Sequence, residues 1–210
     1  MNCRTRVRLE TKFLRLQTPV TIGSRFGEWR VCWLGAPRWS PDSRRIAFSV
    51  LSGGNRDIYY VDADGGAPKQ LTSEASEEGR PSWSQDGQWI YFYSNRSGTQ
   101  QIWKRSLANE QMAQVTFGGG HEAFESPDGK FVLYTRPDVA GLWAVPVGNS
   151  AEQRSETKLL ERVQQSTWAV GEHGIYFVDF EGDSRSGKLL MLYEFKSDPF
   201  RVRSGASHPA

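Results

Sequence analysis

Residues 81–103 read "PSWSQDGQWIYFYSNRSGTQQIW", and residues 37–59 read "PRWSPDSRRIAFSVLSGGNRDIY". The two stretches agree at most of the positions that carry aromatic, branched or turn-forming residues. The core of the pattern occurs a third time at 124–135 as "FESPDGKFVLYT", and a more divergent copy, "WAVGEHGIYFVD", begins at Trp168. Such self-similarity is the signature of a repeat architecture, so the fold is expected to consist of repeated structural units.

The acidic residues in these copies give the period of the repeat. Asp42, Asp86 and Asp128 lie 44 and 42 residues apart, and Glu172 follows another 44 residues later. Each core is followed by a second matched segment: "RDIYYVD", "QQIWKRS", "AGLWAVP" and "KLLMLYE". One period therefore governs most of the chain.

Each copy predicts a sheet of four antiparallel strands. Apolar residues alternate, as at Ile90 and Phe92, which is the spacing of a strand. The string Ser-Pro-Asp-Gly has turn chemistry, because proline presets φ, aspartate bonds its own backbone and glycine accepts a left-handed conformation. Four strands in about 43 residues are typical of a propeller blade. In the most regular copy we expect strands near 81–84, 88–93, 100–105 and 111–116.

The segments "WSPDSRRIAFS", "DIYYVDADGG", "QLT", "WSQDGQWIYFYSNRSG" and "ESPDGKFVLYT" resemble the WD-like repeats of TolB-type β-propellers. The resemblance covers about residues 36–195. It implies an all-β fold in which four-stranded blades surround a central channel and their innermost strands line it. Propellers of this kind serve as binding platforms in periplasmic TolB, in the sensory halves of bacterial regulators and in the gating domains of prolyl oligopeptidase-type peptidases. The later segments are most similar to the C-terminal propeller of winged-helix-type regulators.

The period divides the chain into three clear blades and a degraded fourth. Residues 1–35 do not fit the period and are interpreted as a remnant of a preceding blade, and 205–210 as a disordered tail. Since propellers of this kind usually carry six or more blades, we expect a partial array from a fragmentary gene product. A closed four-bladed ring is the competing geometry. The expected blades span about 36–76, 77–118, 119–162 and 163–204.

The repeated residues are interpreted as architectural rather than chemical. A lone blade cannot bury both of its faces, so stacked blades bury aromatic side chains between them. The aspartates at equivalent positions are turn residues, and successive blades carry them too far apart to act as an acid–base pair. The tryptophans expected to pack between blades are Trp39, Trp83, Trp89, Trp103, Trp143 and Trp168.

Composition and targeting signals limit the possible functions. The formal net charge of +2 gives no reason to expect nucleic-acid binding. Cys3 and Cys32 have no zinc-ligand pattern around them and are expected to be structural thiols or one disulfide. With neither a secretory signal nor an apolar run of about 18 residues, no membrane span is expected. We expect a cytoplasmic protein if Met1 is the true start and, from the resemblance, a periplasmic one if the chain is truncated.

Motifs that could carry chemistry are incomplete. "DADGG" at 62–66 lacks the later oxygen ligands of a calcium loop. "FGGGHEAFE" at 117–125 precedes a strand rather than a helix, so it lacks the geometry of a phosphate-binding loop. No Gly-x-Ser-x-Gly motif occurs, and the three histidines (His121, His173 and His208) have no nucleophile partner that the sequence identifies. We therefore expect no catalytic residue, cofactor or metal.

The sequence predicts a non-catalytic binding or sensory module that recognises a protein or small ligand through its channel face or inter-blade loops. The alternative is an enzyme-associated propeller, either the gating domain of a prolyl oligopeptidase-type peptidase or a hydrolase with its site in the channel. Specificity would lie in the loops at 73–80, 117–121 and 162–166. Since an open array exposes an apolar face at each end, we also expect a homodimer or aggregation. The candidate contact residues are Glu77, Glu78, Arg80, His121 and Glu122.

Overall fold

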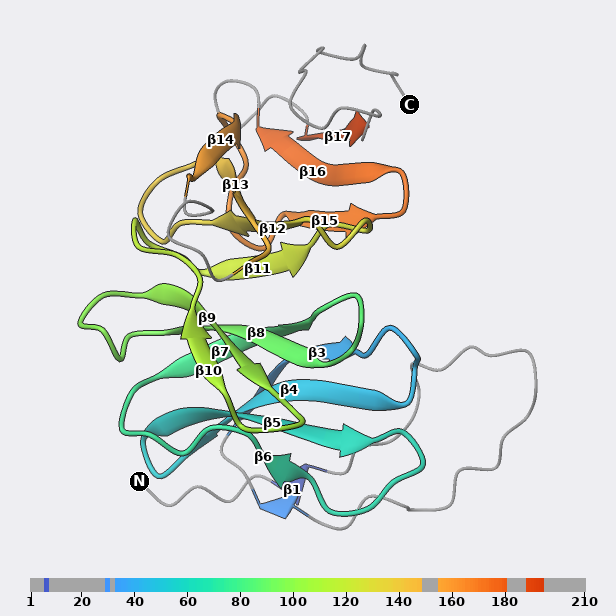
Figure 1. The fold of residues 1–210 in the computed structure, drawn as a ribbon, viewed down its shortest axis with the longest axis vertical. Coiled ribbons are helices and arrows are strands. Elements are labelled where there is room, and N and C mark those ends of the chain that lie inside the picture. The colour runs from blue at the N-terminus through green and yellow to red at the C-terminus, as the bar shows by residue number, and fades with distance from the viewer. Residues whose placement is uncertain (1–5, 8–28, 31–32, 149–154, 181–187, 195–210) are drawn as a thin grey trace.

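The computed structural model describes residues 6–7, 29–30, 33–148, 155–180 and 188–194. The regular structure in these ranges consists of antiparallel β-sheets (Figure 1). A small sheet pairs β1 (Arg6–Val7) with β2 (Trp29–Arg30). A search of the described part of the chain found no helix that could cross a membrane.

Four larger sheets form the blades, and in each the strands are hydrogen-bonded in chain order. The first contains β3 (Trp33–Trp39), β4 (Arg45–Ser52), β5 (Asn55–Asp62) and β6 (Lys69–Gln70). The second contains β7 (Glu78–Trp83), β8 (Trp89–Ser94), β9 (Gln101–Ser106) and β10 (Met112–Gln114). The third contains β11 (Glu122–Glu125), β12 (Phe131–Thr135), β13 (Leu142–Pro146) and β14 (Thr157–Leu160). In the fourth, the described strands are β15 (Trp168–Gly171), β16 (Gly174–Phe180) and β17 (Lys188–Glu194).

The predicted all-β propeller is confirmed, with one blade for each copy of the repeat. In Figure 1 the blades follow one another from the first at the bottom to the fourth at the top. The expected strands of the second copy overlap β7 to β10, but β7 begins at Glu78 rather than at residue 81. A bulge between Gly79 and Ser82 carries the pairing past Pro81, which has no amide to donate. Both cysteines, most of the N-terminal segment and the tail lie outside the described residues.

A serine and an aspartate fix the turn that follows each of the first three inner strands, β3, β7 and β11. In the second blade, the Ser84 hydroxyl donates to Asp86 Oδ1 at 2.5 Å and the Gln88 amide donates to the same oxygen at 2.9 Å. The Trp89 amide then donates to Ser84 Oγ at 2.9 Å. The same three bonds recur around Ser40 and Asp42 and around Ser126 and Asp128. The repeated aspartates are therefore turn residues, as predicted.

Apolar clusters lie between successive blades. The first and second blades bury Ala47, Ile58, Trp83, Ile90 and Phe92, with Trp103 packed against them. The second and third bury Tyr91, Tyr93, Ile102, Val132, Tyr134 and Trp143. The third and fourth bury Leu133, Leu142, Val163, Trp168, Ile175 and Phe177. Four of the six predicted tryptophans therefore pack between blades, while Trp89 is half-buried under the Lys104 ammonium, 4.7 Å from its ring centre.

Trp39 does not pack between blades, so the prediction was wrong for this residue. Its side chain is 43% exposed. Trp39 pairs with Ile46, on the face of the first blade that points away from the second. The equivalent Trp83 faces the first blade, where its indole nitrogen donates to the Arg38 carbonyl at 2.9 Å. No blade in the described ranges precedes the first one, so none of them offers Trp39 a matching carbonyl.

Replacing Asp86 with alanine should lower the free energy of unfolding by about 1 kcal/mol, because two turn hydrogen bonds lose their acceptor. For a chain of this size the melting temperature should fall by about 2–4 °C, which circular dichroism measures. Asp64→Ala is the matched control, since Asp64 is exposed in the hairpin at 62–66. An equal fall in both variants would show that the turn bonds are not what stabilises the blade.

Candidate functional site

The inner strands β3, β7, β11 and β15 meet at the axis of the propeller, and the two ends of this axis differ chemically. We call the side on which these strands begin the loop end, because the loops at 73–80, 117–121 and 162–166 lie there. The opposite side, where the strands run into the blade turns, is the turn end. The five predicted contact residues come from the loop end.

Glu122 connects all four blades. It is the first residue of β11, and it is 3% exposed. Its Oε1 accepts hydrogen bonds from Arg38 Nη2 at 3.4 Å and from Arg80 Nη1 at 3.3 Å. Its Oε2 accepts from the amide of Ser166 at 3.2 Å. Because these donors belong to the first and second blades and to the loop before the fourth, one buried carboxylate holds the inner strands together.

A backbone irregularity brings Arg80 to this position. Arg80 lies in the bulge between Gly79 and Ser82 and has a φ of 51°. A left-handed φ is uncommon for a residue with a side chain, and a bulge re-aims the side chain it carries. Ala36 and Ser166 have φ values of 49° and 61° at the corresponding points of the first and fourth blades. The first, second and fourth blades thus share a bend at the loop end, and in the second blade it turns an arginine toward the axis.

His121 and Glu77 belong to a neighbouring network that spans the first three blades. The His121 ring stacks on Tyr93 with centroids 5.4 Å apart, and its Nδ1 lies 2.7 Å from Gln100 Nε2. The Tyr93 hydroxyl accepts a hydrogen bond from Arg56 Nη1 at 2.7 Å. Arg56 in turn forms an ion pair with Glu77 at 3.2 Å. These polar groups are therefore largely satisfied by one another.

The environment of His121 keeps its imidazole neutral. Burial and, secondarily, the positive charge of Arg80 lower the pKa of His121 to about 4. The Gln100 Nε2 atom can only donate, so with this amide orientation Nδ1 accepts and the neutral ring carries its proton on Nε2. At pH 7 this histidine is a hydrogen-bonding group and not an anion-binding charge.

Glu78 lies apart from the axis and is 0% exposed. Its Oε1 accepts from the Ser94 hydroxyl at 2.9 Å and from Arg96 Nη2 at 3.1 Å. Burial and the negative charge of Glu78 raise the pKa of the adjacent Asp57 to about 6. Glu78 thus forms its hydrogen bonds within the second blade, with no surface in this conformation for a ligand to touch.

The glycine-rich loop before β11 is packed against the protein. The amides of Gly119 and Gly120 donate to Gln101 Oε1 and to the Gln100 carbonyl, both at 2.9 Å. A β-carbon on Gly120 would come within 2.5 Å of Ile102 Cγ1, so the loop requires glycine there. A shallow depression of about 650 Å³ lies beside the loop, with Phe117 and Val139 on its rim. These amides are used internally and do not form a phosphate cradle.

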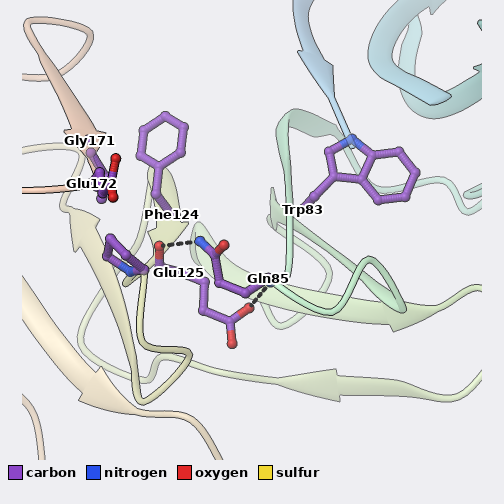
Figure 2. Close-up of a pocket in the computed structure, with 8 residues that line it drawn as sticks. Trp83, Gln85, Phe124, Glu125, Gly171 and Glu172 are labelled. Carbon is purple, nitrogen blue, oxygen red and sulfur yellow. Dashed lines mark hydrogen bonds between the residues drawn. The ribbon is translucent and has the colours of Figure 1, made fainter. Parts of the chain in front are cut away.

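A second concave site lies at the turn end of the axis. This pocket has a volume of about 350 Å³ and is built from the ends of three inner strands and the turns that follow them. Figure 2 shows Phe124, Glu125 and Gln85 between Trp83 on one side and Gly171 and Glu172 on the other. The lining residues are Trp83, Gln85, Phe124, Glu125, Pro127, Val170, Gly171 and Glu172.

Glu125 is the buried charged group of this pocket, which we call the axial pocket. It is 6% exposed, and its Oε2 accepts a hydrogen bond from the backbone amide of Gln85 at 2.8 Å (Figure 2). Burial raises the pKa of Glu125, and the negative charges of Asp86 and Asp128 add to this effect. Hydrogen bonding to Gln85 and the charge of Lys104 oppose it, and the net direction is upward. The carboxylate is therefore incompletely compensated by the protein.

The polar residues at the axis differ in how fully other groups of the protein engage them. Within the described ranges, no three His, Cys, Asp or Glu side chains lie close enough together to hold a metal ion. Glu122 is engaged by two arginines, and His121 is engaged by Gln100 and Tyr93. The aromatic and carboxylate groups of the axial pocket line its concave surface, where a ligand could contact them.

The structure brings Arg80 and Glu122 into direct contact, places Glu77 and His121 in the adjoining network, and sets Glu78 apart. Sequence reasoning missed Arg38 and the turn-end residues of the axial pocket as functional candidates. A signal for Glu125 was present, because it occupies the position that carries Trp39 and Trp83 in the two preceding copies. A charge that replaces an aromatic residue at a repeat position is the pattern to search for.

Replacing Glu122 with glutamine should lower the free energy of unfolding by about 2 kcal/mol, because two arginines lose their charged acceptor while the Ser166 amide keeps an oxygen. Urea denaturation measures the change. Glu77→Gln is the matched control, since Glu77 is 51% exposed in its pair with Arg56 and should cost less than about 0.5 kcal/mol. Equal effects would contradict the central role of Glu122.

The stability of the chain should depend on pH through His121. Its pKa of about 4 in the folded state lies below the ordinary histidine value of 6.5, so the unfolded state binds this proton first as pH falls. The contribution of neutral His121 to the free energy of unfolding is therefore complete above pH 6.5 and is lost progressively as pH falls toward 4. A His121→Gln variant should lack this component in urea denaturation between pH 7 and 4. An NMR titration midpoint for His121 near 6.5 would contradict the assignment.

Comparison with known proteins agrees with the architecture. Residues 28–192 match the family described as the TolB beta propeller domain. The TolB protein of Acinetobacter baumannii has a similar structure, with a TM-score of 0.60 and 22% identity, covering 79% of this chain and 42% of that one. A putative TolB from Agrobacterium tumefaciens gives a TM-score of 0.52 at 16% identity, covering 80% and 79%. At these identities the likeness concerns the fold alone.

Three sequence relatives match about half of the chain. An uncharacterized protein of Agrobacterium fabrum is 32% identical over 102 residues, and the Tol-Pal system protein TolB of Desulfosudis oleivorans is 32% identical over 89 residues. Dipeptidyl-peptidase 5 of Porphyromonas gingivalis is 33% identical over 105 residues. The matches cover 48%, 42% and 46% of this chain, but 35%, 20% and 15% of the relatives. Since the family match extends over most of the repeats, the chain belongs to the TolB-type β-propeller family.

Proposed function

We propose that the chain is a non-catalytic recognition module that binds a protein or small ligand at the axis of its propeller. The observation that carries the proposal is the axial pocket, to which three consecutive blades contribute. Its volume of about 350 Å³ lies at the lower end of the range for ligand sites and suits a single side chain or a small molecule.

The state of the polar groups at the loop end supports binding rather than catalysis. General acid–base chemistry needs a group free to exchange a proton with a substrate. The carboxylate of Glu122 is shared by two guanidinium groups, and the Nδ1 atom of His121 is occupied by Gln100. These residues stabilise the blades, which leaves the axial pocket as the recognition surface.

The particular form of this function that we propose is sensory. The later repeat segments resemble the propellers of winged-helix-type regulators, and a propeller with a ligand pocket at its axis suits the sensing half of such a protein. In such a regulator this propeller would bind the ligand and another domain would bind DNA, since no DNA-binding element is assigned to the described residues. A winged-helix domain encoded in frame beside this segment would support this form.

Binding without turnover should be observed for the purified chain. On a peptide array, a subset of sequences should bind saturably, and Phe124→Leu should weaken that binding because Phe124 lines the axial pocket. Phe117→Leu is the matched control, since Phe117 lies on the rim of the other depression. No hydrolysis of ester, lactone or peptide substrates is expected. Turnover that disappears in His121→Ala would overturn the proposal.

A second candidate function is an enzyme-associated propeller. It is favoured by the 33% identity over 105 residues with dipeptidyl-peptidase 5, of which the match covers 15%. In this case a hydrolase domain would be encoded in frame with the propeller. Sequencing the genomic DNA on both sides of the coding segment distinguishes the candidates, because a hydrolase domain there would favour the enzyme and a winged helix the sensor.

A further inference from the structure

We propose that the axial pocket binds an organic cation, an ammonium or guanidinium group, between the aromatic side chains Trp83 and Phe124 and the carboxylates Glu125 and Glu172. The inference rests on the proposed function, because it names the class of ligand for the same pocket. The source of the cation is either a Lys or Arg side chain of a partner protein or a free small amine.

The charge of the pocket is unbalanced. Of the residues that line it, two are carboxylates and none is Lys or Arg. Neither Glu125 nor Glu172 forms an ion pair within the described part of the chain. Lys104 acts on Glu125 only at a distance and lies over the ring of Trp89. A positive ligand would complete the charge, whereas an anion would meet two carboxylates of the same sign.

Glu125 holds an accepting atom in reserve. The residue is more than nine-tenths buried, yet only Oε2 receives a hydrogen bond from a described residue. Oε1 has no donor among the described residues, and it is not one of the fully enclosed side-chain atoms, so it retains contact with solvent. The Oε1 atom is free to accept an N–H from an ammonium or guanidinium group.

The same chain builds this arrangement with its own arginines at several places, of which two involve a tryptophan ring. Arg96 lies 5.1 Å from the ring centre of Trp103 and 3.1 Å from Glu78. Arg136 lies 4.6 Å from the ring centre of Trp143 and bonds Glu156 at 2.5 Å. In both places a cation lies over an aromatic face while a carboxylate accepts its hydrogen bond.

The axial pocket repeats two parts of this arrangement and lacks the third. Phe124 and Trp83 supply the rings, and Glu125 and Glu172 supply the carboxylates. Arg38 lies 5.3 Å from the Phe124 ring centre, but its guanidinium is bonded to Glu122 rather than to either pocket carboxylate. The Phe124 ring therefore already has a cation on one side, whereas the pocket carboxylates have no cation paired with them in the described part of the chain.

Titration with short capped peptides tests the inference. The probes are acetyl-Gly-Lys-Gly-amide and acetyl-Gly-Arg-Gly-amide, with the Gln and Glu versions as neutral and anionic counterparts and n-butylammonium as a free amine. NMR shifts of the Val170 methyl groups and the Gly171 amide report occupancy of the pocket. We expect the Lys or Arg peptide to bind and the Gln and Glu peptides to bind at least tenfold more weakly. If n-butylammonium binds as tightly as the peptides, a free small amine is the source of the cation. If n-butylammonium does not bind, the source is a side chain of a partner protein.

Charge-neutralising variants complete the test. Glu172→Gln and Glu125→Gln should each weaken cation binding about tenfold. Glu161→Gln is the control and should leave binding unchanged, because the Glu161 side chain is 79% exposed and does not line the pocket. Because Glu172 is exposed in a turn, Glu172→Gln should retain the wild-type melting temperature, so a loss of binding cannot be ascribed to unfolding.

Two outcomes would overturn the inference. If the Gln or Glu peptide binds as tightly as the Lys peptide, the pocket does not select charge, while the proposed recognition function stands. If none of the probes shifts the Val170 and Gly171 signals, the pocket is not a cation site, and the peptide array decides separately whether the chain binds by another surface.

Discussion

A single buried carboxylate constrains the whole propeller. Burying a charge is costly unless it is paired and hydrogen-bonded, and the partners of Glu122 come from other blades. Arg38, Arg80 and Ser166 are 84, 42 and 44 residues from it in sequence. All three donors reach one carboxylate only if the four inner strands meet at the same height on the axis. The requirement therefore couples the position of each blade to that of the others.

The apolar clusters between blades and the carboxylate at the axis act differently. Burial of Ile, Phe and Trp side chains supplies a large but non-directional stabilisation, which would tolerate some sliding of one blade on the next. Hydrogen bonds at the axis limit that sliding. Arg38 contributes most directly, because its carbonyl accepts from the Trp83 indole while its guanidinium reaches Glu122 and lies over Phe124. One residue of the first blade thus touches the second and the third.

The sequence was sufficient to predict the fold because the blade is a local object. Ser84 and Asp86, and their equivalents, form their turn within a few residues, so the pattern that repeats in the sequence is the pattern that repeats in space. The prediction for Trp39 failed for a related reason. A residue at a repeat position inherits its neighbours from the adjacent blade, and the repeat alone does not reveal which blade stands first.

The candidate site was predictable only in part, because it depends on contacts between blades. Loop position pointed to Arg80 and Glu122, which the structure places in contact, but their pairing depends on a bulge that has no strong sequence signature. Glu78 was grouped with them as a loop residue, although it is the buried first residue of β7. Glu125 lies within a repeat motif, where its neighbours favoured an architectural reading. What distinguishes it is the missing counter-charge, which becomes visible only when the three strand ends are placed together.

The two ends of the axis differ in how far their charges are paired. At the loop end, arginines are paired with both Glu122 and Glu77, so neither carboxylate lacks a counter-charge. At the turn end, Glu125 and Glu172 have no such partners among the described residues, and the aspartates of the turns raise the negative potential further. Paired charges stabilise a fold. Unpaired charges lower its stability but can attract a ligand of opposite charge. The repeat supplies a rigid frame at one end, and departures from the repeat, such as a carboxylate in place of a tryptophan, give the other end its chemistry.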